Sequence, residues 1–437
     1  MKRDAFSLSY FLLIIFYSLF ASCKTTAQIS RQAEKTLITD TAISKGFIGI
    51  SVFDPSYNTY LYNYNADKYF VPASNVKLFT LYAGMKYLGD SLVGLRYDSA
   101  ENGITRIYPS GDPTFLASEF NHQPVLHFLK QHRNVEFQEN ILVPPFGYGW
   151  AWDDYKEDFM TARSAFPIYK NVFSIRWINK DSVDIYPHYF AVKAQAIVSS
   201  FAGFTVLKGF DNNDISILPG SEKNKSYPFA PDMITRDALI TDTIQHISIT
   251  GKINYAFQRN TTAQVIHSQA SDSLFKPMMH YSDNFFAEQT LLMASNEHLG
   301  CMNTAMIIDT LLGLDLKDAP QKPKWVDGSG LSRYNLFTPQ DFIYILNKMK
   351  NEFGVERMKN ILATGGEGTL KNYFKKDAGF IYAKTGTLSN NCALSGYIIT
   401  KKNRLLIFSI LANNYQTGAT PVRKAVEKFV EYLRDTY

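Results

Sequence analysis

Two side chains at the start of a predicted helix have the types and spacing of a nucleophile and its base. Ser74 and Lys77 occur in the segment Ser-Asn-Val-Lys, just after Pro72, where a mostly apolar run from 73 to 88 begins. In a helix, positions i and i+3 share a face, so the Lys77 amine could reach the Ser74 hydroxyl and take its proton. This spacing predicts a serine nucleophile activated by lysine.

Two later segments carry side chains suited to the same chemistry. Ser282 and Asn284, in Ser-Asp-Asn, place a hydroxyl and an amide two residues apart. Lys384, Thr385, Gly386 and Thr387 form Lys-Thr-Gly-Thr at the end of a short apolar run. They offer a second cation, two hydroxyls and a glycine that lets a strand backbone come close to a ligand.

Each of these motifs is weak evidence alone. Ser273 and Lys276 repeat the first spacing, although Pro277 would disturb a helix that continues beyond that lysine. Segments 56–58 and 389–391 repeat the second. The order of the three motifs is the specific signal, because it is typical of penicillin-binding proteins and serine β-lactamases.

Further segments narrow the resemblance to one branch. The segments 111–114, 148–154, 327–332 and 366–370 resemble parts of the D-alanyl-D-alanine carboxypeptidases and endopeptidases of the penicillin-binding protein 4 type, the low-molecular-mass class C penicillin-binding proteins. The resemblance covers roughly residues 45 to 437. The wide gap between the first two motifs is consistent with an inserted domain, although the insertion is shorter than in many relatives.

The resemblance implies acyl transfer from a D-alanyl-D-alanine stem peptide and inhibition by β-lactam antibiotics. Ser74 would attack the carbonyl, and the pKa of Lys77 must fall from about 10.4 toward about 7 to 8 for it to act as the base. Ser282 would relay a proton, and Asn284 would hold Lys77 and the substrate amide.

The same resemblance assigns the third motif to substrate binding. Lys384, Thr385 and Thr387 would bind the terminal carboxylate, beside Gly386. The backbone N–H groups of Ser74 and Thr387 would form the oxyanion hole. Neither a metal nor an organic cofactor is implied.

The predicted elements indicate an α+β fold, a transpeptidase domain like that of penicillin-binding proteins and serine β-lactamases, with an antiparallel sheet flanked by helices. Strands are predicted at 47–53, 59–64, 394–400 and 405–411, with an amphipathic helix at the C-terminus. The peptidase domain would comprise 23–92 and 259–437. The strand-rich and turn-rich stretch 93–258 would be an inserted β-rich domain.

The N-terminus predicts export to the cell envelope. Residues 1–22 have the features of a signal peptide, and Cys23 ends a segment resembling a bacterial lipobox. We therefore expect a periplasmic lipoprotein anchored through Cys23, with an uncleaved membrane anchor as the alternative. The net charge of +5, without a basic run, argues against a nucleic-acid partner.

Several alternatives stay open from sequence alone. The same three motifs would suit a serine β-lactamase, or could be present in a non-catalytic protein that binds the cell wall. Carboxypeptidase and endopeptidase activities are not separable, and the oligomeric state is unknown. Tyr148, Trp150 and Trp152 are interpreted as packing in the core of the inserted domain, and Cys392 as a small core residue.

Overall fold

The computed structural model divides into two compact units. It describes residues 26–99, 103–139, 144–179, 182–196, 205–210, 212–218, 224–253 and 262–437. The first unit takes the described residues of Met1–Asn75, Ala319–Lys324 and Leu336–Tyr437, and the second takes those of Val76–Asp318 and Trp325–Asn335. The predicted boundaries of the peptidase domain and the inserted domain stay a prediction.

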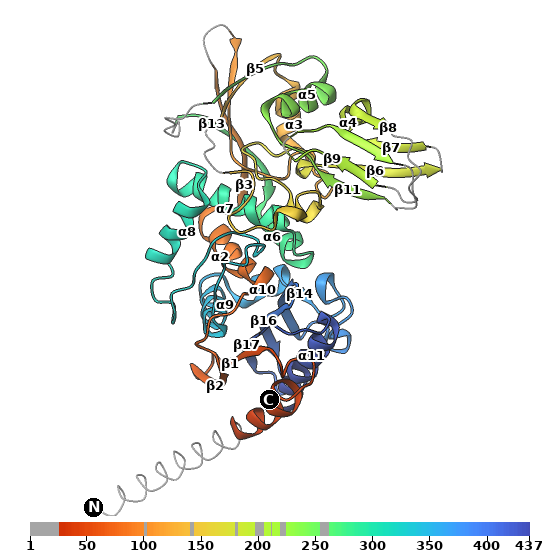
Figure 1. Ribbon diagram of the computed structural model, residues 1–437. Coiled ribbons are helices and arrows are strands. Elements are labelled where there is room, and N and C mark those ends of the chain that lie inside the picture. The colour runs from red at the N-terminus through yellow and green to blue at the C-terminus, as the bar shows by residue number, and fades with distance from the viewer. Residues whose placement is uncertain are drawn as a thin grey trace, which may run out of the picture. The chain divides into compact units, whose positions relative to one another are not determined.

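The first unit is organised around a six-stranded antiparallel sheet that joins the two ends of the chain (Figure 1). Its order is β14-β15-β16-β17-β1-β2, so the N-terminal strand β1 pairs with the C-terminal strand β17. The strands are β1 (Phe47–Asp54), β2 (Thr59–Tyr64), β14 (Ala363–Thr364), β15 (Ile381–Leu388), β16 (Asn391–Ile399) and β17 (Leu405–Asn413). The antiparallel sheet predicted from both chain ends is confirmed.

Helices cover both faces of this sheet. Alternate residues of β1 face opposite sides: Gly49 lies against Pro339 of α9 (Pro339–Phe353), whereas Ile48 belongs to the apolar cluster that contains Val422 and Phe429 of α11 (Ala419–Thr436). The remaining helical elements of this unit are residues 26–33, η1 (Glu34–Ile38), α10 (Val355–Ile361), η7 (Gly368–Leu370) and η8 (Lys375–Asp377).

The second unit contains a cluster of buried helices. The helical turn η2 (Ala73–Val76), which starts in the first unit, leads into α2 (Lys77–Tyr87); α2 contacts both α6 (Ser271–His280) and α7 (Asn284–Leu299), and α8 (Thr304–Gly313) packs on α7. Helix α7 begins where the Asp283 side chain accepts a hydrogen bond from the Phe286 amide. Helix α6 continues through Pro277 to His280, so the proline does not end this helix.

The rest of the second unit is rich in strands. A five-stranded sheet has the order β12-β5-β4-β3-β13, and two three-stranded sheets have the orders β11-β6-β7 and β8-β10-β9. The strands are β3 (Ser91–Ser99), β4 (Thr105–Pro109), β5 (Asn134–Glu139), β6 (Val172–Asn179), β7 (Ser182–Tyr186), β8 (Ala194–Ala196), β9 (Thr205–Lys208), β10 (Ile215–Leu218), β11 (Lys225–Pro228), β12 (Ser248–Ile253) and β13 (Gln264–Ala270).

Short helices accompany these strands. They are α3 (Pro124–Lys130), η4 (Trp152–Asp154), η5 (Asp158–Met160), η6 (Tyr169–Asn171), α4 (His188–Lys193) and α5 (Met233–Ile244). The sequence pattern did not predict α5, although Asp232 provides a side-chain cap that accepts a hydrogen bond from the Thr235 amide. Leu239 and Ile240 of α5 complete the apolar core of this region.

Candidate active site

Lys77 lies at the first position of α2 with its amine fully enclosed. Its exposed fraction is 0%. The Nζ atom donates hydrogen bonds of 2.6 Å to Oδ1 of Asn284 and of 2.6 Å to the carbonyl oxygen of Ser329. The second unit therefore brings the lysine of the first motif into contact with the amide of the second.

Burial shifts the proton equilibrium of Lys77 toward the neutral amine. Burial lowers the pKa of Lys77 to about 8, while the carboxylates of Asp327, Asp283 and Glu288 act in the opposite direction. A lysine with its ordinary pKa of about 10.4 would be almost entirely protonated at neutral pH. The site therefore raises the neutral fraction of the amine well above that of an ordinary lysine, while the protonated form still predominates at neutral pH.

The Ser-Asp-Asn motif leads into α7, and all three of its residues line a cavity of about 400 Å³ in the second unit. Asn284 also donates through Nδ2 to the Phe159 carbonyl at 2.9 Å, and Asp283 accepts from Lys170 at 2.7 Å. Ser282, which lines the cavity, has a φ of 59°, a strained conformation for a residue with a side chain. Strain of this kind concentrates at functional sites.

Ser74 lies in the first unit, in the tight turn η2, beside the third motif. A Cβ atom on Gly386 would stand 2.5 Å from the Pro72 carbonyl oxygen and 3.1 Å from the Ser74 amide nitrogen. Only glycine permits this approach of strand β15 to the turn. The turn is held further by Nδ2 of Asn75, which donates to Oγ of Ser395 at 2.8 Å.

The other residues of the third motif follow β15. Lys384 is buried, and its Nζ atom donates to the Thr385 carbonyl at 2.7 Å. Thr387 is exposed, and its Oγ1 atom accepts a hydrogen bond of 2.5 Å from Nη2 of Arg423 on α11. Arg423 was not predicted, because no motif surrounds it.

The predicted site residues thus form two groups. The first unit holds Ser74, Lys384, Thr385, Gly386 and Thr387, and the second unit holds Lys77, Ser282 and Asn284. The chain links the groups directly, because Ser74 and Lys77 are three residues apart. Their convergence on one catalytic centre stays a prediction.

A buried polar network supports the loop 327–332, in which the Ser329 carbonyl accepts a hydrogen bond from the Lys77 amine. The Asp327 carboxylate accepts hydrogen bonds from the amides of Gly330 and Ser332, at 2.9 and 2.7 Å, and from side chains of Asn335 and Trp150, at 2.7 and 2.9 Å. These bonds fix the loop around Ser329. The sequence around Asp327 did not indicate that its carboxylate is buried.

Two aromatic residues differ from the prediction. Tyr148 and Trp152 are 75% and 74% exposed, so they do not pack in a core. Trp150 is only partly buried, and its indole nitrogen serves the Asp327 carboxylate. Amphipathic rings of this type often remain at a surface, where the polar end stays solvated. Cys392 is buried, as expected of a small core residue.

Other features of the described residues bear on the predicted chemistry. No group of three or more His, Cys, Asp or Glu side chains within these ranges could hold a metal ion. No described helix combines the length and apolar character of a membrane span. The predicted signal peptide 1–22 and Cys23 lie outside the described residues.

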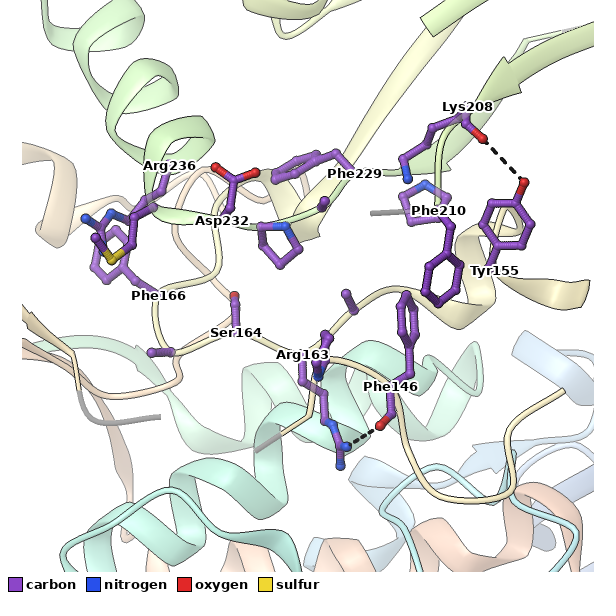
Figure 2. A pocket seen from close by; sticks show the side chains of 17 residues that line it. Phe146, Tyr155, Arg163, Ser164, Phe166, Lys208, Phe210, Phe229, Asp232 and Arg236 are labelled. Atoms are coloured by element: carbon purple, nitrogen blue, oxygen red, sulfur yellow. Dashed lines mark hydrogen bonds between the residues drawn. The ribbon is translucent and has the colours of Figure 1, made fainter. Parts of the chain in front are cut away.

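A second cavity of about 360 Å³ contains none of the predicted site residues (Figure 2). The Phe146 and Phe210 rings form one side of it, with centroids 5.2 Å apart. Arg163 lines it as well, but its guanidinium turns away from the cavity toward the Phe146 carbonyl.

Comparisons with solved structures define the class of fold. The crystal structure of penicillin binding protein 4 (dacB) from Haemophilus influenzae is similar to this chain with a TM-score of 0.73 and 19% identity, covering 93% of this chain and 99% of that one. The fold of this chain is therefore that of penicillin binding protein 4, which agrees with the predicted α+β fold of the penicillin-binding protein type.

Comparisons of sequence then identify the family. The chain matches the D-Ala-D-Ala carboxypeptidase 3 (S13) family over residues 30–435, and it belongs to that family. It is 25% identical to D-alanyl-D-alanine carboxypeptidase DacB of Haemophilus influenzae over 90% of both chains. It is 31% identical to the D-alanyl-D-alanine carboxypeptidase of Actinomadura sp. (strain R39) over 37% of this chain and 32% of that one. The protein is a serine-type D-alanyl-D-alanine peptidase.

Proposed function

We propose that Ser74 is the nucleophile and Lys77 the general base of this peptidase, acting on peptidoglycan stem peptides. Oγ of Ser74 bonds to the penultimate carbonyl carbon while its proton passes to the neutral Lys77 amine. The C–N bond then breaks, and the departing amine takes a proton. Water hydrolyses the ester and regenerates Ser74. The contact between the buried amine of Lys77 and Asn284 supports this assignment most directly.

The remaining motif residues have supporting roles in this proposal. Ser282 relays the proton toward the leaving nitrogen, and Asn284 orients Lys77 and the substrate amide. Lys384, Thr385 and Thr387 bind the terminal carboxylate, with Gly386 allowing the strand to come close. The amides of Ser74 and Thr387 stabilise the oxyanion, where loss of one donor typically costs about 3 to 4 kcal/mol. No metal or organic cofactor takes part.

The substrate and location follow from the same proposal. Penicillin acylates Ser74 in place of the peptide, because its strained amide presents a carbonyl and a carboxylate in a similar arrangement. The protein works in the cell envelope as a periplasmic lipoprotein tethered through Cys23. Residues 93–258 form an inserted domain within a peptidase domain of 23–92 and 259–437.

Labelling with a fluorescent penicillin tests the nucleophile. We expect the wild type to be labelled and Ser74→Ala to remain unlabelled, while Ser273→Ala, a matched serine in the other Ser-x-x-Lys segment, is labelled normally. Labelling of Ser74→Ala would refute the assignment. Rapid release of hydrolysed penicillin would instead indicate a β-lactamase, and absence of labelling in the wild type a non-catalytic protein.

Incubation with purified muropeptides tests the substrate. Mass spectrometry distinguishes loss of one D-alanine, the carboxypeptidase product, from cleavage of cross-linked dimers, the endopeptidase product. If protein that penicillin labels forms neither product, the proposed stem-peptide substrate is contradicted.

A further inference from the structure

A carboxylate lies buried within the helix that carries the second motif. Glu288 is one helical turn beyond Asn284 in α7 and has an exposed fraction of 0%. Its neighbours along the helix are mostly apolar. Burying an ionised carboxylate is unfavourable unless specific partners compensate for the lost water. The partners of Glu288 therefore indicate why the residue is there.

The two carboxylate oxygens of Glu288 contact Ser329, which accepts a hydrogen bond from Lys77, and Arg163. Oε1 accepts the Ser329 amide at 2.8 Å, while the Ser329 carbonyl accepts the Lys77 amine at 2.6 Å. Oε2 lies 3.4 Å from Nη1 of Arg163. Ser329 thus lies between Glu288 and Lys77, and its backbone bonds to both.

Arg163 is itself held firmly, so it provides a fixed counter-charge. Its Nη2 atom donates to the carbonyls of Pro144 and Phe146 at 2.8 and 3.0 Å, and Nη1 lies 3.4 Å from Oγ1 of Thr304. Figure 2 shows the Phe146 contact, with the guanidinium directed away from the cavity. This fixed geometry holds the Glu288 carboxylate in place behind Ser329.

The charges around Glu288 and Lys77 determine whether Glu288 raises or lowers the pKa of Lys77. Burial raises the pKa of Glu288, and Asp327 adds to that rise, whereas Arg163 opposes it. Asp327, Asp283 and Glu288 all stabilise the protonated form of Lys77, and Asp283 is paired with Lys170. Above about pH 7, where the Glu288 carboxylate is ionised, removing its charge should therefore make Lys77 lose its proton more readily.

We propose that Glu288 is a positioning residue for Lys77: it holds the Ser329 backbone that receives the lysine amine, and its charge adjusts the proton affinity of that amine. The inference rests on the proposed function, in which Lys77 is the base. It assigns a role in acyl transfer to a carboxylate that does not itself touch the substrate.

The test compares the pH dependence of acylation in the wild type and in Glu288→Gln. The amide retains an oxygen that accepts the Ser329 N–H but removes the charge. We expect the acid limb of the rate of labelling by fluorescent penicillin to move to lower pH by about half a unit or more. Glu297→Gln is the matched control, because Glu297 lies on the same helix and pairs with Arg96 instead; its profile should superimpose on that of the wild type.

A second variant keeps the inference testable if Glu288→Gln does not fold. Glu288→Asp retains the charge but shortens the side chain, which should withdraw the acceptor from the Ser329 amide. We expect its acid limb to stay near that of the wild type while the plateau rate of acylation falls.

The two levels of failure give different results. If the wild type shows no Ser74-dependent labelling, the proposed function fails, and this inference fails with it. If labelling depends on Ser74 but Glu288→Gln has the wild-type acid limb, or one moved to higher pH, only the role of Glu288 is overturned. A Glu288→Asp plateau equal to that of the wild type would equally overturn the positioning role.

Discussion

Replacing Gly386 by alanine should separate strand β15 from the turn that carries Ser74. The added Cβ would lie 2.5 Å from the Pro72 carbonyl oxygen, whereas ordinary contact begins at 3.4 Å. The strand or the turn must therefore move by about 0.9 Å, and a misplacement of about 1 Å near a reacting group can lower a rate about a hundredfold. The unfolding free energy should also fall by about 1 to 3 kcal/mol, as for other overpacked sites.

The assay is the second-order rate of acylation by a fluorescent penicillin, measured alongside thermal unfolding. Gly313→Ala is the control, because a Cβ there meets nothing within 4 Å and the position ends helix α8. That variant should acylate normally and be slightly more stable. If Gly386→Ala acylates at the wild-type rate, close approach of the strand to Ser74 is not required for catalysis.

Three further perturbations test other parts of the site. Burial lowers the pKa of Lys77 to about 8, so the neutral base is lost below that pH. The acylation rate should therefore fall about tenfold per pH unit on the acid side. A rate that is flat across this range would contradict Lys77 as the base. Arg423→Ala removes the 2.5 Å hydrogen bond to Thr387 and should raise the KM for a peptide substrate a few-fold. This corresponds to a loss of about 0.5 to 1 kcal/mol of binding free energy at this exposed site, with partial recovery in Arg423→Lys. An unchanged KM would exclude a role in substrate binding. Ser395→Ala removes the buried acceptor of the Asn75 amide and should lower the unfolding free energy by about 1 to 3 kcal/mol in denaturant titration; unaltered stability would show that the amide finds another partner.

The sequence was most informative where chemistry constrains residue type and order. The three motifs, in one order along the chain, predicted the family that the comparisons identify. The strands near the termini were predictable because their apolar runs are bounded by turn residues. Both inferences need only local sequence and the order of the segments.

Packing was harder to predict than order. Glu288 in an apolar helix has the same sequence pattern as a surface acid, and only the neighbouring Ser329 and Arg163 reveal it as a buried one. Tyr148 and Trp152 were predicted to be buried but are exposed, because aromatic side chains occur both in cores and at surfaces. In both cases the side chain's partners are distant in the sequence, so periodicity carries no information about them.

The pairing of β1 with β17 affects how the protein must be made. Within the sheet, β1 has β2 on one side and β17 on the other, and β17 does not end until Asn413. A nascent chain that already carries Ser74 therefore lacks the strand that joins β1 to the rest of the sheet. Contacts so distant in sequence form late and slowly. The six-stranded sheet can therefore close only when synthesis has passed Asn413, and a chain truncated before β17 would lack the strand that lies between β16 and β1.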